Sequence, residues 1–402
     1  MNCLPNSAYF TFALKRTCHW SLFVRSWFAA GLALSLSGCG QDPSPPPAGD
    51  EPAFCIDAAG TPAPAGRLEL RHVARARERD AVCNDGSDAS YYIRHGTGCG
   101  AGRWIIALQG GGSCQQAACP DRATYLMSTQ DDPAFKDDGG LLSADATQNP
   151  DFYTATQVYV RYCSSDVFSG DRPASADTGG IEFRGSRIVA AVLEDLADPE
   201  ITGTSNLGTA REVLLAGGSA GGVGVLQNLD RVREKLPGRF VRGFSDAGWE
   251  VDIELHGRTL TTTQEATAIG SFWNGQSDAD CMATETAEPG RCGVGETLQP
   301  YLQTPLFMQQ SQRDPSKLGN NGVTEPLDDA ELAYIERYAA QTRESLTRLG
   351  ELDGVYSPYD PHHTRLWDDD AFNEAVIGDV SLRQALGDWY FGRATTRLIE
   401  SP

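Results

Sequence analysis

The sequence predicts an α/β fold in which helices flank a mostly parallel β-sheet, and three observations predict it. Short runs rich in β-forming residues alternate with segments of helical periodicity. One of these runs ends in a glycine-rich turn around a serine, and a helix begins directly after it. No internal repeat or second linker follows Cys55. One domain is therefore expected over residues 55–402, which is long enough to bury a large sheet.

Six strands are expected, because each run is short, rich in β-branched or aromatic residues and bounded by glycine, proline or polar residues. Their ranges are Arg103–Gln109, Gln157–Tyr162, Val213–Gly217, Phe240–Ser245, Pro305–Gln310 and Gly354–Tyr359.

Three helices are expected from apolar residues at helical spacing, within 188–196, 226–232 and 332–349. Pro237 and Gly238 end the second helix. Asp328 and Glu331 form a capping box at the start of the third helix, and Gly350 ends it. The polar, irregular segment 252–300 holds Cys281 and Cys292. It is predicted to be an insertion, or lid, over one end of the sheet.

The most informative motif is GGSAG at 217–221, which places Ser219 at the centre of a GxSxG pattern. The motif follows the predicted strand Val213–Gly217 and precedes a helix, as a nucleophile elbow requires. In such a turn the flanking glycines permit a strained backbone that exposes the serine hydroxyl. Without this context the pattern is weak, because the chain contains 43 glycines. We predict that Ser219 is a nucleophile.

The general base is expected after the last predicted strand, since triads of this fold class run serine, acid, histidine along the chain. His362 and His363 are the two candidates, and the residues alone leave both open. For the acid, Asp314 follows the strand just before the histidines and is preferred from strand order. Asp246, which follows the preceding strand, is the alternative.

A second glycine-rich segment, LQGGGSC at 108–114, follows an early strand. Lipases and esterases carry an oxyanion loop at this place. A phosphate-binding loop is the rival interpretation, but the Walker lysine and the GxGxxG spacing are both missing here. The predicted oxyanion donors are the backbone N–H groups of Gly111, Gly112 and Ala220.

The N-terminus resembles an export signal. Residues 1–38 carry basic residues and then an apolar run that ends in LSGC, which resembles the bacterial lipobox with Cys39 as the lipidated residue. An ordinary signal peptide is the alternative. Residues 39–54 are rich in proline and are expected to form a tether. The expected location is the bacterial cell envelope, as an outer-membrane lipoprotein anchored by its lipid, or outside the cell.

Cysteine usage supports export. Of the 11 cysteines, Cys3 and Cys18 fall in the signal and Cys39 takes the lipid, which leaves an even number in an oxidising compartment. Two local pairings, Cys114 with Cys119 and Cys281 with Cys292, are favoured by proximity. Zinc-type spacing is missing from the sequence, and neither metal nor cofactor is expected.

The net charge is −21, from 33 Lys and Arg residues against 54 Asp and Glu residues. That balance excludes a general nucleic-acid binder, and it repels polyanionic substrates at long range. A monomer that acts on an acylated small molecule or glycan is expected.

Taken together, these motifs and several others resemble those of the pectin acetylesterase/Notum family of α/β hydrolases. The motifs that carry the resemblance recur in the same order across residues 55–393. They are CNDGS (83–87), LQGGGSC (108–114), NPDFY (149–153), VRYCSSDVFSGD (160–171), LLAGGSAGGVGVLQNLDRV (214–232), VRGFSDAGW (241–249), TPLF (304–307) and GDWYF (387–391).

The resemblance implies a serine esterase with a triad of Ser219, Asp314 and His362 or His363, and the family pattern favours His363, which Thr364 follows. It also implies the disulfides Cys114–Cys119, Cys281–Cys292, Cys99–Cys163 and, for the remaining pair, Cys55–Cys83. Ser113 departs from the tryptophan that the family usually has in or after the glycine loop, so acyl-chain preference does not carry over.

The expected activity is deacetylation of a polysaccharide through an acyl-enzyme. A Notum-like esterase acting on a lipid or an acylated protein is the alternative within the enzyme class. A non-catalytic surface-binding lipoprotein is the alternative outside it.

Overall fold

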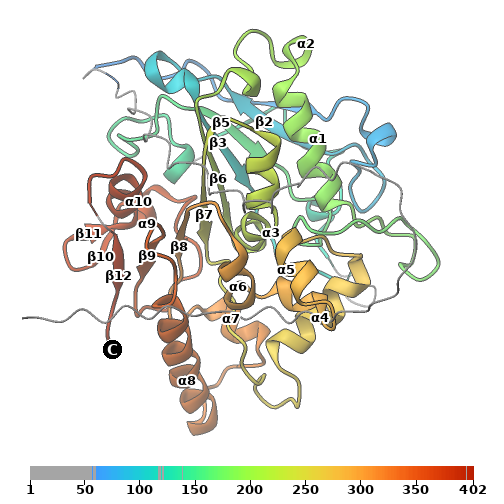
Figure 1. The fold of residues 1–402 in the computed structure, drawn as a ribbon, viewed down its shortest axis with the longest axis vertical. Helices are drawn as coiled ribbons and strands as arrows, with labels where there is room; N and C mark the ends of the chain where they lie inside the picture. Colours follow the sequence, from blue (N-terminus) through green and yellow to red (C-terminus); the bar gives the residue numbers. More distant parts are fainter. Residues whose placement is uncertain (1–56, 58–59, 116–118, 120–121, 138, 395) are drawn as a thin grey trace, which may run out of the picture. The chain divides into compact units, whose positions relative to one another are not determined.

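The computed structural model describes residues 57, 60–115, 119, 122–137, 139–394 and 396–402. Its main element is a ten-stranded sheet in the order β12-β9-β8-β7-β6-β3-β5-β2-β1-β4 (Figure 1). The strands are β1 (Leu68–His72), β2 (Ser90–Arg94), β3 (Arg103–Leu108), β4 (Phe135–Lys136), β5 (Thr156–Val160), β6 (Glu212–Gly218), β7 (Phe240–Asp246), β8 (Leu306–Gln309), β9 (Gly354–Ser357) and β12 (Arg397–Ile399). A separate hairpin pairs β10 (Ala375–Ile377) with β11 (Val380–Ser381).

The predicted fold class is confirmed. The strands from β12 across to β5 run parallel, and β2, β1 and β4 add antiparallel pairs at one edge. The six predicted strands are β3, β5, β6, β7, β8 and β9, which are neighbours in the middle of the sheet. At the other edge β12 pairs with β9. There Glu400 accepts hydrogen bonds from the Tyr359 N–H through its carboxylate and from the Gln312 side chain through its carbonyl.

Helices cover both faces of the sheet (Figure 1). They are α1 (Gly185–Ala197), α2 (Pro199–Thr202), α3 (Ala220–Lys235), α4 (Thr262–Trp273), α5 (Ala279–Thr284), α6 (Gly295–Leu298), α7 (Pro315–Asn320), α8 (Asp329–Leu346), α9 (Asp369–Asn373) and α10 (Leu382–Tyr390). Successive side chains of a strand point to opposite faces. In β3, Trp104, Ile106 and Leu108 therefore join the core with α1, α3 and α8, whereas Ile105 and Ala107 join the core with α9 and α10. Each large side chain buried in this way contributes about 2 kcal/mol.

The three predicted helices are α1, α3 and α8, with one difference at an end. The capping box of α8 is present, because the Asp328 carboxylate accepts the Glu331 N–H and the Glu331 carboxylate accepts the Asp328 N–H. The helix ends at Leu346, before Gly350. The Gly350 N–H instead donates to the carboxylate of Asp353, which lies beside the start of β9. Gly350 therefore belongs to the turn that enters β9.

Segment 252–300, which was predicted to be an insertion over one end of the sheet, is more regular than its sequence suggests. It contains α4, α5 and α6. Thr261 and Gln264 form a capping box at the start of α4, and the Cys281–Cys292 disulfide joins α5 to the turn that follows it. The segment connects β7 to β8, and so it is placed at the carboxyl end of β7.

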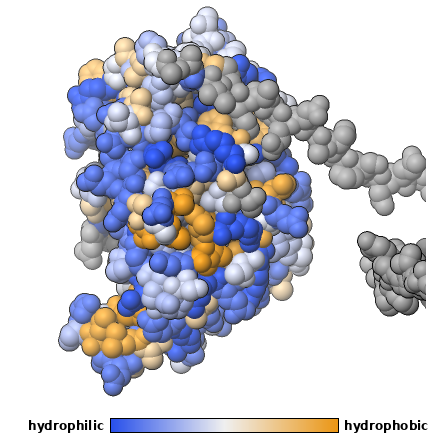
Figure 2. Space-filling model, turned by 90° about the vertical axis from the view of Figure 1, so that its left-hand side faces the viewer, coloured by the Kyte–Doolittle hydropathy of each residue, from blue (hydrophilic) through white to orange (hydrophobic). Residues whose placement is uncertain are grey.

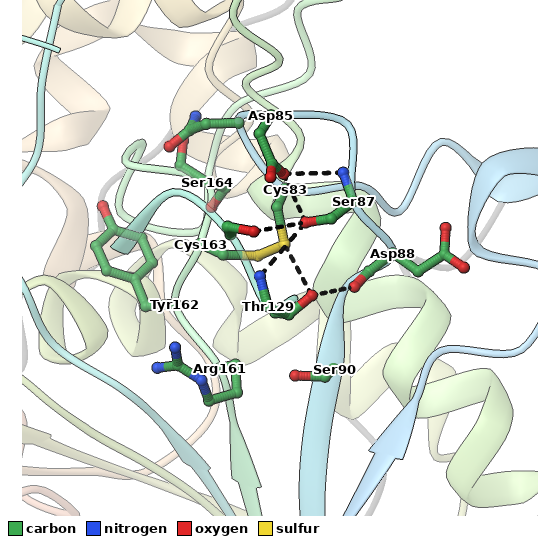
Figure 3. Close-up of a disulfide and its surroundings, with 12 residues drawn as sticks. Cys83, Asp85, Ser87, Asp88, Ser90, Thr129, Arg161, Tyr162, Cys163 and Ser164 are labelled. Carbon is green, nitrogen blue, oxygen red and sulfur yellow. Dashed lines mark hydrogen bonds between the residues drawn. A yellow bond between two sulfur atoms is a disulfide. The ribbon is translucent and has the colours of Figure 1, made fainter. Parts of the chain in front are cut away.

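Two of the predicted disulfide pairings are wrong. Cys83 is bonded to Cys163, which excludes both Cys55–Cys83 and Cys99–Cys163 (Figure 3). The reason is the antiparallel pairing of β2 with β5, which brings the start of β2 beside the end of β5. Cys83 precedes β2 and Cys163 follows β5, and the Asn84 N–H donates to the Cys163 carbonyl. Cys99 is also disulfide-bonded. Cys114–Cys119 and Cys281–Cys292 are present as predicted.

The predicted signal peptide (1–38), the lipidation site Cys39 and the tether (39–54) lie outside the described residues. Within the described part of the chain, none of the helices combines the length and the apolar character that crossing a membrane requires.

Apolar residues gather in places on the face shown in Figure 2, which is the left-hand side of Figure 1. The β10–β11 hairpin and α10 lie on that side (Figure 1).

Candidate functional site

Ser219 lies at the turn between β6 and α3 in a backbone conformation that L-residues rarely adopt, with φ 56° and ψ −122°. Glycines make the turn possible. A Cβ on Gly221 would lie 2.0 Å from the Leu108 carbonyl oxygen, and one on Gly217 would lie 2.3 Å from the Gly221 carbonyl oxygen. The Ser219 N–H donates to the Asp246 carbonyl at 2.8 Å, which ties the turn to β7. Strain of this kind is held in place by its surroundings and is common at functional sites.

Asp314 and His363 contact each other directly. His363 Nδ1 lies 2.8 Å and 3.0 Å from the two carboxylate oxygens of Asp314. Because a carboxylate only accepts hydrogen bonds, Nδ1 carries the proton and Nε2 is left as an acceptor. Asp314 is completely buried after β8 and caps α7, where it also accepts the N–H groups of Ser316 and Lys317. The His363 ring therefore has a fixed orientation and a fixed tautomer.

The alternative residues have other partners. His362 Nε2 lies 3.0 Å from the Thr364 carbonyl oxygen. Asp246, completely buried at the end of β7, accepts the backbone N–H groups of Arg365 and Leu366 at 2.7 Å and 2.8 Å. Burial raises the pKa of Asp246 to about 7, although these two N–H groups act in the opposite direction. Asp246 thus holds the segment that follows His363, and the His363 ring is bonded to Asp314.

The glycine loop after β3 lies against the serine turn. A Cβ on Gly110 would lie 2.6 Å from the Gly218 carbonyl oxygen and 3.1 Å from Ser219 Cβ. Gly111 (φ 145°) and Gly112 (φ 66°) have positive φ values that favour glycine. Within the described ranges, the N–H groups of Gly111 and Gly112 have no hydrogen-bond acceptor. The N–H of Ala220 lies in the first turn of α3, where an N–H has no partner within the helix.

Ser219, Ala220 and His363 line a common pocket of about 640 Å³, which we name the serine pocket. Gly112 and Ser113 lie on its wall, so Ser113 faces the same space as Ser219. Segment 252–300 forms another wall with both apolar and polar side chains, among them Ala266, Ile269, Trp273, Asn274, Met282 and Val294. The Trp273 indole donates to the Cys114 carbonyl and thereby joins α4 to the glycine-loop region.

Three side chains of the site were not predicted. Lys317, which is nearly buried, forms an ion pair with Glu250, and both line the serine pocket. A Cβ on Gly218 would lie 2.8 Å from the indole nitrogen of Trp367. Glu250, Lys317 and Trp367 come from three separate segments, and their local patterns carry no sign that they meet. Among the described residues, no three histidine, cysteine or acidic side chains come together in a group that could hold a metal ion.

The chain is similar to several known proteins. Palmitoleoyl-protein carboxylesterase NOTUM of Drosophila melanogaster is 35% identical over 322 residues, which is 77% of this chain and 46% of that protein. Pectin acetylesterase 11 of Arabidopsis thaliana is 27% identical over 365 residues, or 83% of this chain and 90% of that protein. A crystal structure of the Wnt deacylase Notum from Drosophila has a TM-score of 0.75 at 32% identity, and the match covers 84% of this chain and 97% of that chain.

The chain spans about half the length of the animal relatives that it matches. The sequence pattern of the pectinacetylesterase family matches residues 63–402. Because this match covers most of the chain, the protein belongs to the pectinacetylesterase family.

Proposed function

We propose that this protein is a serine carboxylic-ester hydrolase that removes O-acyl groups through an acyl-enzyme. The observation that carries the proposal is the contact between His363 and the buried Asp314, with His363 facing the pocket that Ser219 also lines. The relatives named as a carboxylesterase and an acetylesterase support the same reaction class.

In the proposed mechanism, Ser219 Oγ attacks the acyl carbon while its proton moves to His363 Nε2. Asp314 keeps the ring in the required tautomer and stabilises its cation. The N–H groups of Gly111, Gly112 and Ala220 are positioned for the oxyanion that develops. The proton on His363 then passes to the leaving alcohol. In the second half, His363 takes a proton from the water that attacks the acyl-enzyme. It then returns this proton to Ser219 Oγ as the acyl–Oγ bond breaks and the acid is released.

The preferred substrate is an acetylated polysaccharide. Polar side chains of the serine pocket, among them Asn274, Gln276 and Asn321, support it because they can bind hydroxyl groups. One observation favours the second candidate, a lipid or acylated-protein substrate. The apolar side chains Ala266, Ile269 and Met282 on one wall leave room for a longer acyl chain.

We also propose that the protein is exported, with a lipid on Cys39 as its anchor. The disulfides support export, because structural disulfides persist in oxidising compartments.

The reactive serine is tested with a fluorophosphonate probe and p-nitrophenyl esters of increasing chain length. We expect the probe to label the wild-type protein at Ser219, and Ser219→Ala to lose the label and lower kcat by several orders of magnitude without unfolding. An unlabelled, inactive but folded wild-type protein would support the non-catalytic binding alternative. The chain-length profile separates the two substrate candidates, since acetyl preference favours the first.

A further inference from the structure

A second cavity, of about 450 Å³, lies at the carboxyl ends of the parallel strands, as the serine pocket does. We name it the tyrosine pocket, and its residues used here are Tyr92, Tyr125, Tyr159, Gln109, Asp131, Asp132, Lys136 and Arg161. Gln109 follows β3 and Arg161 follows β5, as Ser219 follows β6. Because β6, β3 and β5 are parallel neighbours, their carboxyl ends lie side by side at one end of the sheet. Figure 3 shows Arg161 beside Ser90, the first residue of β2, at this edge.

Side-chain contacts connect the tyrosine pocket to the serine turn. The Trp367 indole packs against Gly218, the residue before Ser219. The same indole meets the Tyr159 ring edge-to-face, with 5.5 Å between the ring centroids. Gln109 is the residue before the glycine loop, and its own side chain lines the tyrosine pocket. Trp367 therefore lies between the serine turn and the tyrosine pocket, in contact with a residue of each.

The composition of the tyrosine pocket suits a sugar ring. The Tyr125 side chain is 61% exposed at its wall, yet its backbone is fixed because Arg161 donates to the Tyr125 carbonyl at 2.8 Å. An exposed aromatic face on an anchored backbone is a surface on which the C–H groups of a pyranose can pack. Gln109 Oε1 accepts from Arg161 and from the Tyr162 N–H, which leaves its NH₂ group and the Asp131 carboxylate to hydrogen-bond to hydroxyls.

The charges of the tyrosine pocket favour an uncharged sugar. The Arg161 guanidinium is paired with Asp132 at 2.8 Å, and both side chains are nearly buried. The Lys136 ammonium lies 4.7 Å from the centre of the Tyr159 ring. With Asp131 and Asp132 beside Lys136 and Arg161, the pocket lining has two acidic and two basic side chains and no net formal charge. No excess positive charge is left among these groups to hold a polyuronate, which the net charge of −21 also repels.

We propose that the tyrosine pocket is a glycan subsite, and that it binds an uncharged sugar of an acetylated polysaccharide whose ester lies at Ser219. This inference rests on the proposed esterase function and narrows its substrate to a neutral acetylated glycan.

The test compares Tyr125→Ala with wild type on acetylated xylan, on acetylated polygalacturonate of matched length and acetylation, and on p-nitrophenyl acetate. We expect Tyr125→Ala to lower the ratio of kcat/KM on acetylated xylan to kcat/KM on p-nitrophenyl acetate at least about tenfold, mainly through KM. Tyr125→Phe keeps the ring and should retain most of the ratio. Leu352→Ala is the control. It removes a side chain that is 75% exposed just before the amino end of β9, away from the carboxyl ends of the strands, and it should leave the ratio unchanged.

An unchanged ratio in Tyr125→Ala overturns the subsite, and so does a preference for acetylated polygalacturonate that depends on Tyr125. Failure of the esterase proposal would look different, because the wild-type protein would then not hydrolyse p-nitrophenyl acetate. Calorimetry with an uncharged xylohexaose decides the subsite in either case. Binding by Ser219→Ala that Tyr125→Ala abolishes in the same background supports it, and absence of binding to Ser219→Ala refutes it.

Discussion

Asp246 and Asp314 are both completely buried carboxyl groups near the same histidine, and their partners give them different roles. Asp314 accepts from the His363 ring, whereas Asp246 accepts from the backbone of Arg365 and Leu366. An amide at position 314 could donate to Nδ1 and would favour the wrong tautomer. An amide at position 246 can still accept both backbone N–H groups through its oxygen.

We therefore expect Asp314→Asn to lower kcat by about 10⁴-fold, the size of loss seen when a triad carboxylate is replaced by an amide. Asp246→Asn should lower kcat far less. Steady-state kinetics on p-nitrophenyl acetate measure both variants, and circular dichroism checks their folding. A larger loss in Asp246→Asn than in Asp314→Asn would exchange the two roles.

The histidine pair gives a prediction about pH. In the proposed mechanism His363 accepts the serine proton and must be neutral to do so, and we therefore expect kcat/KM to rise with pH. His363→Ala should lose both the activity and this rise. His362→Ala should keep both, because its ring contacts the Thr364 carbonyl and not Asp314. A pH profile of each variant makes the measurement, and an inactive His362→Ala beside an active His363→Ala contradicts the assignment.

At the scale of elements, the sequence predicted the middle of the sheet and missed its edges. The middle strands are buried on both faces, so a run such as 104–108 is apolar throughout and is easy to recognise. β1 reads LELRH and is half exposed, and β4 has two residues. β2 was not predicted from the sequence, and this explains the two wrong disulfide pairings. Only the pairing of β2 with β5 shows that Cys83 lies beside Cys163.

The site was predicted to a similar degree. Strand order alone indicates that residues after β8 and β9 meet, and the contact of Asp314 with His363 agrees with it. Neither the Trp367 contact with Gly218 nor the Lys317–Glu250 ion pair follows from any local pattern. Both depend on how distant segments pack, which strand order leaves open.

The Cys83–Cys163 disulfide, which joins the segment before β2 to the segment after β5, is expected to stabilise the fold strongly. Cys83 and Cys163 are 80 residues apart, and closing a loop of that length removes chain entropy worth about 4 kcal/mol from the unfolded state. Replacing both cysteines by serine should lower the free energy of unfolding by that order in a denaturant titration. The same change at Cys114 and Cys119, which are 5 residues apart, should cost about 2 kcal/mol. Equal losses from the two pairs would contradict this explanation.

At the scale of the whole molecule, buried carboxyl groups make stability depend on pH. Burial raises the pKa of Asp246 to about 7 and that of Asp166 to about 6, from 3.8 in the unfolded chain. Between about pH 4 and pH 7 the folded protein therefore binds more protons than the unfolded chain. The free energy of unfolding then falls as the pH rises through this window.

We expect Tm to be higher at pH 5 than at pH 7.5 by a few degrees. In Asp246→Asn the difference should be smaller, because one of the two groups no longer titrates. Calorimetry at the two pH values measures the Tm difference in each protein. The other ionisable groups are the same in wild type and variant, so comparing the two Tm differences isolates the contribution of Asp246. An identical pH dependence in the variant would show that Asp246 does not contribute.

The pairing of β12 with β9 affects when activity can first arise during synthesis. Residues 397–400 extend the sheet beside the strand that leads to His363, and Glu400 bonds the segments that carry Asp314 and His363 through Gln312 and Tyr359. The ribosome makes these residues after Ser219, Asp314 and His363. A nascent chain in which Ser219 is already folded thus lacks the strand beside the segment that carries His363. We expect such a chain to lack the proposed esterase activity until residues 397–400 have been made and paired with β9.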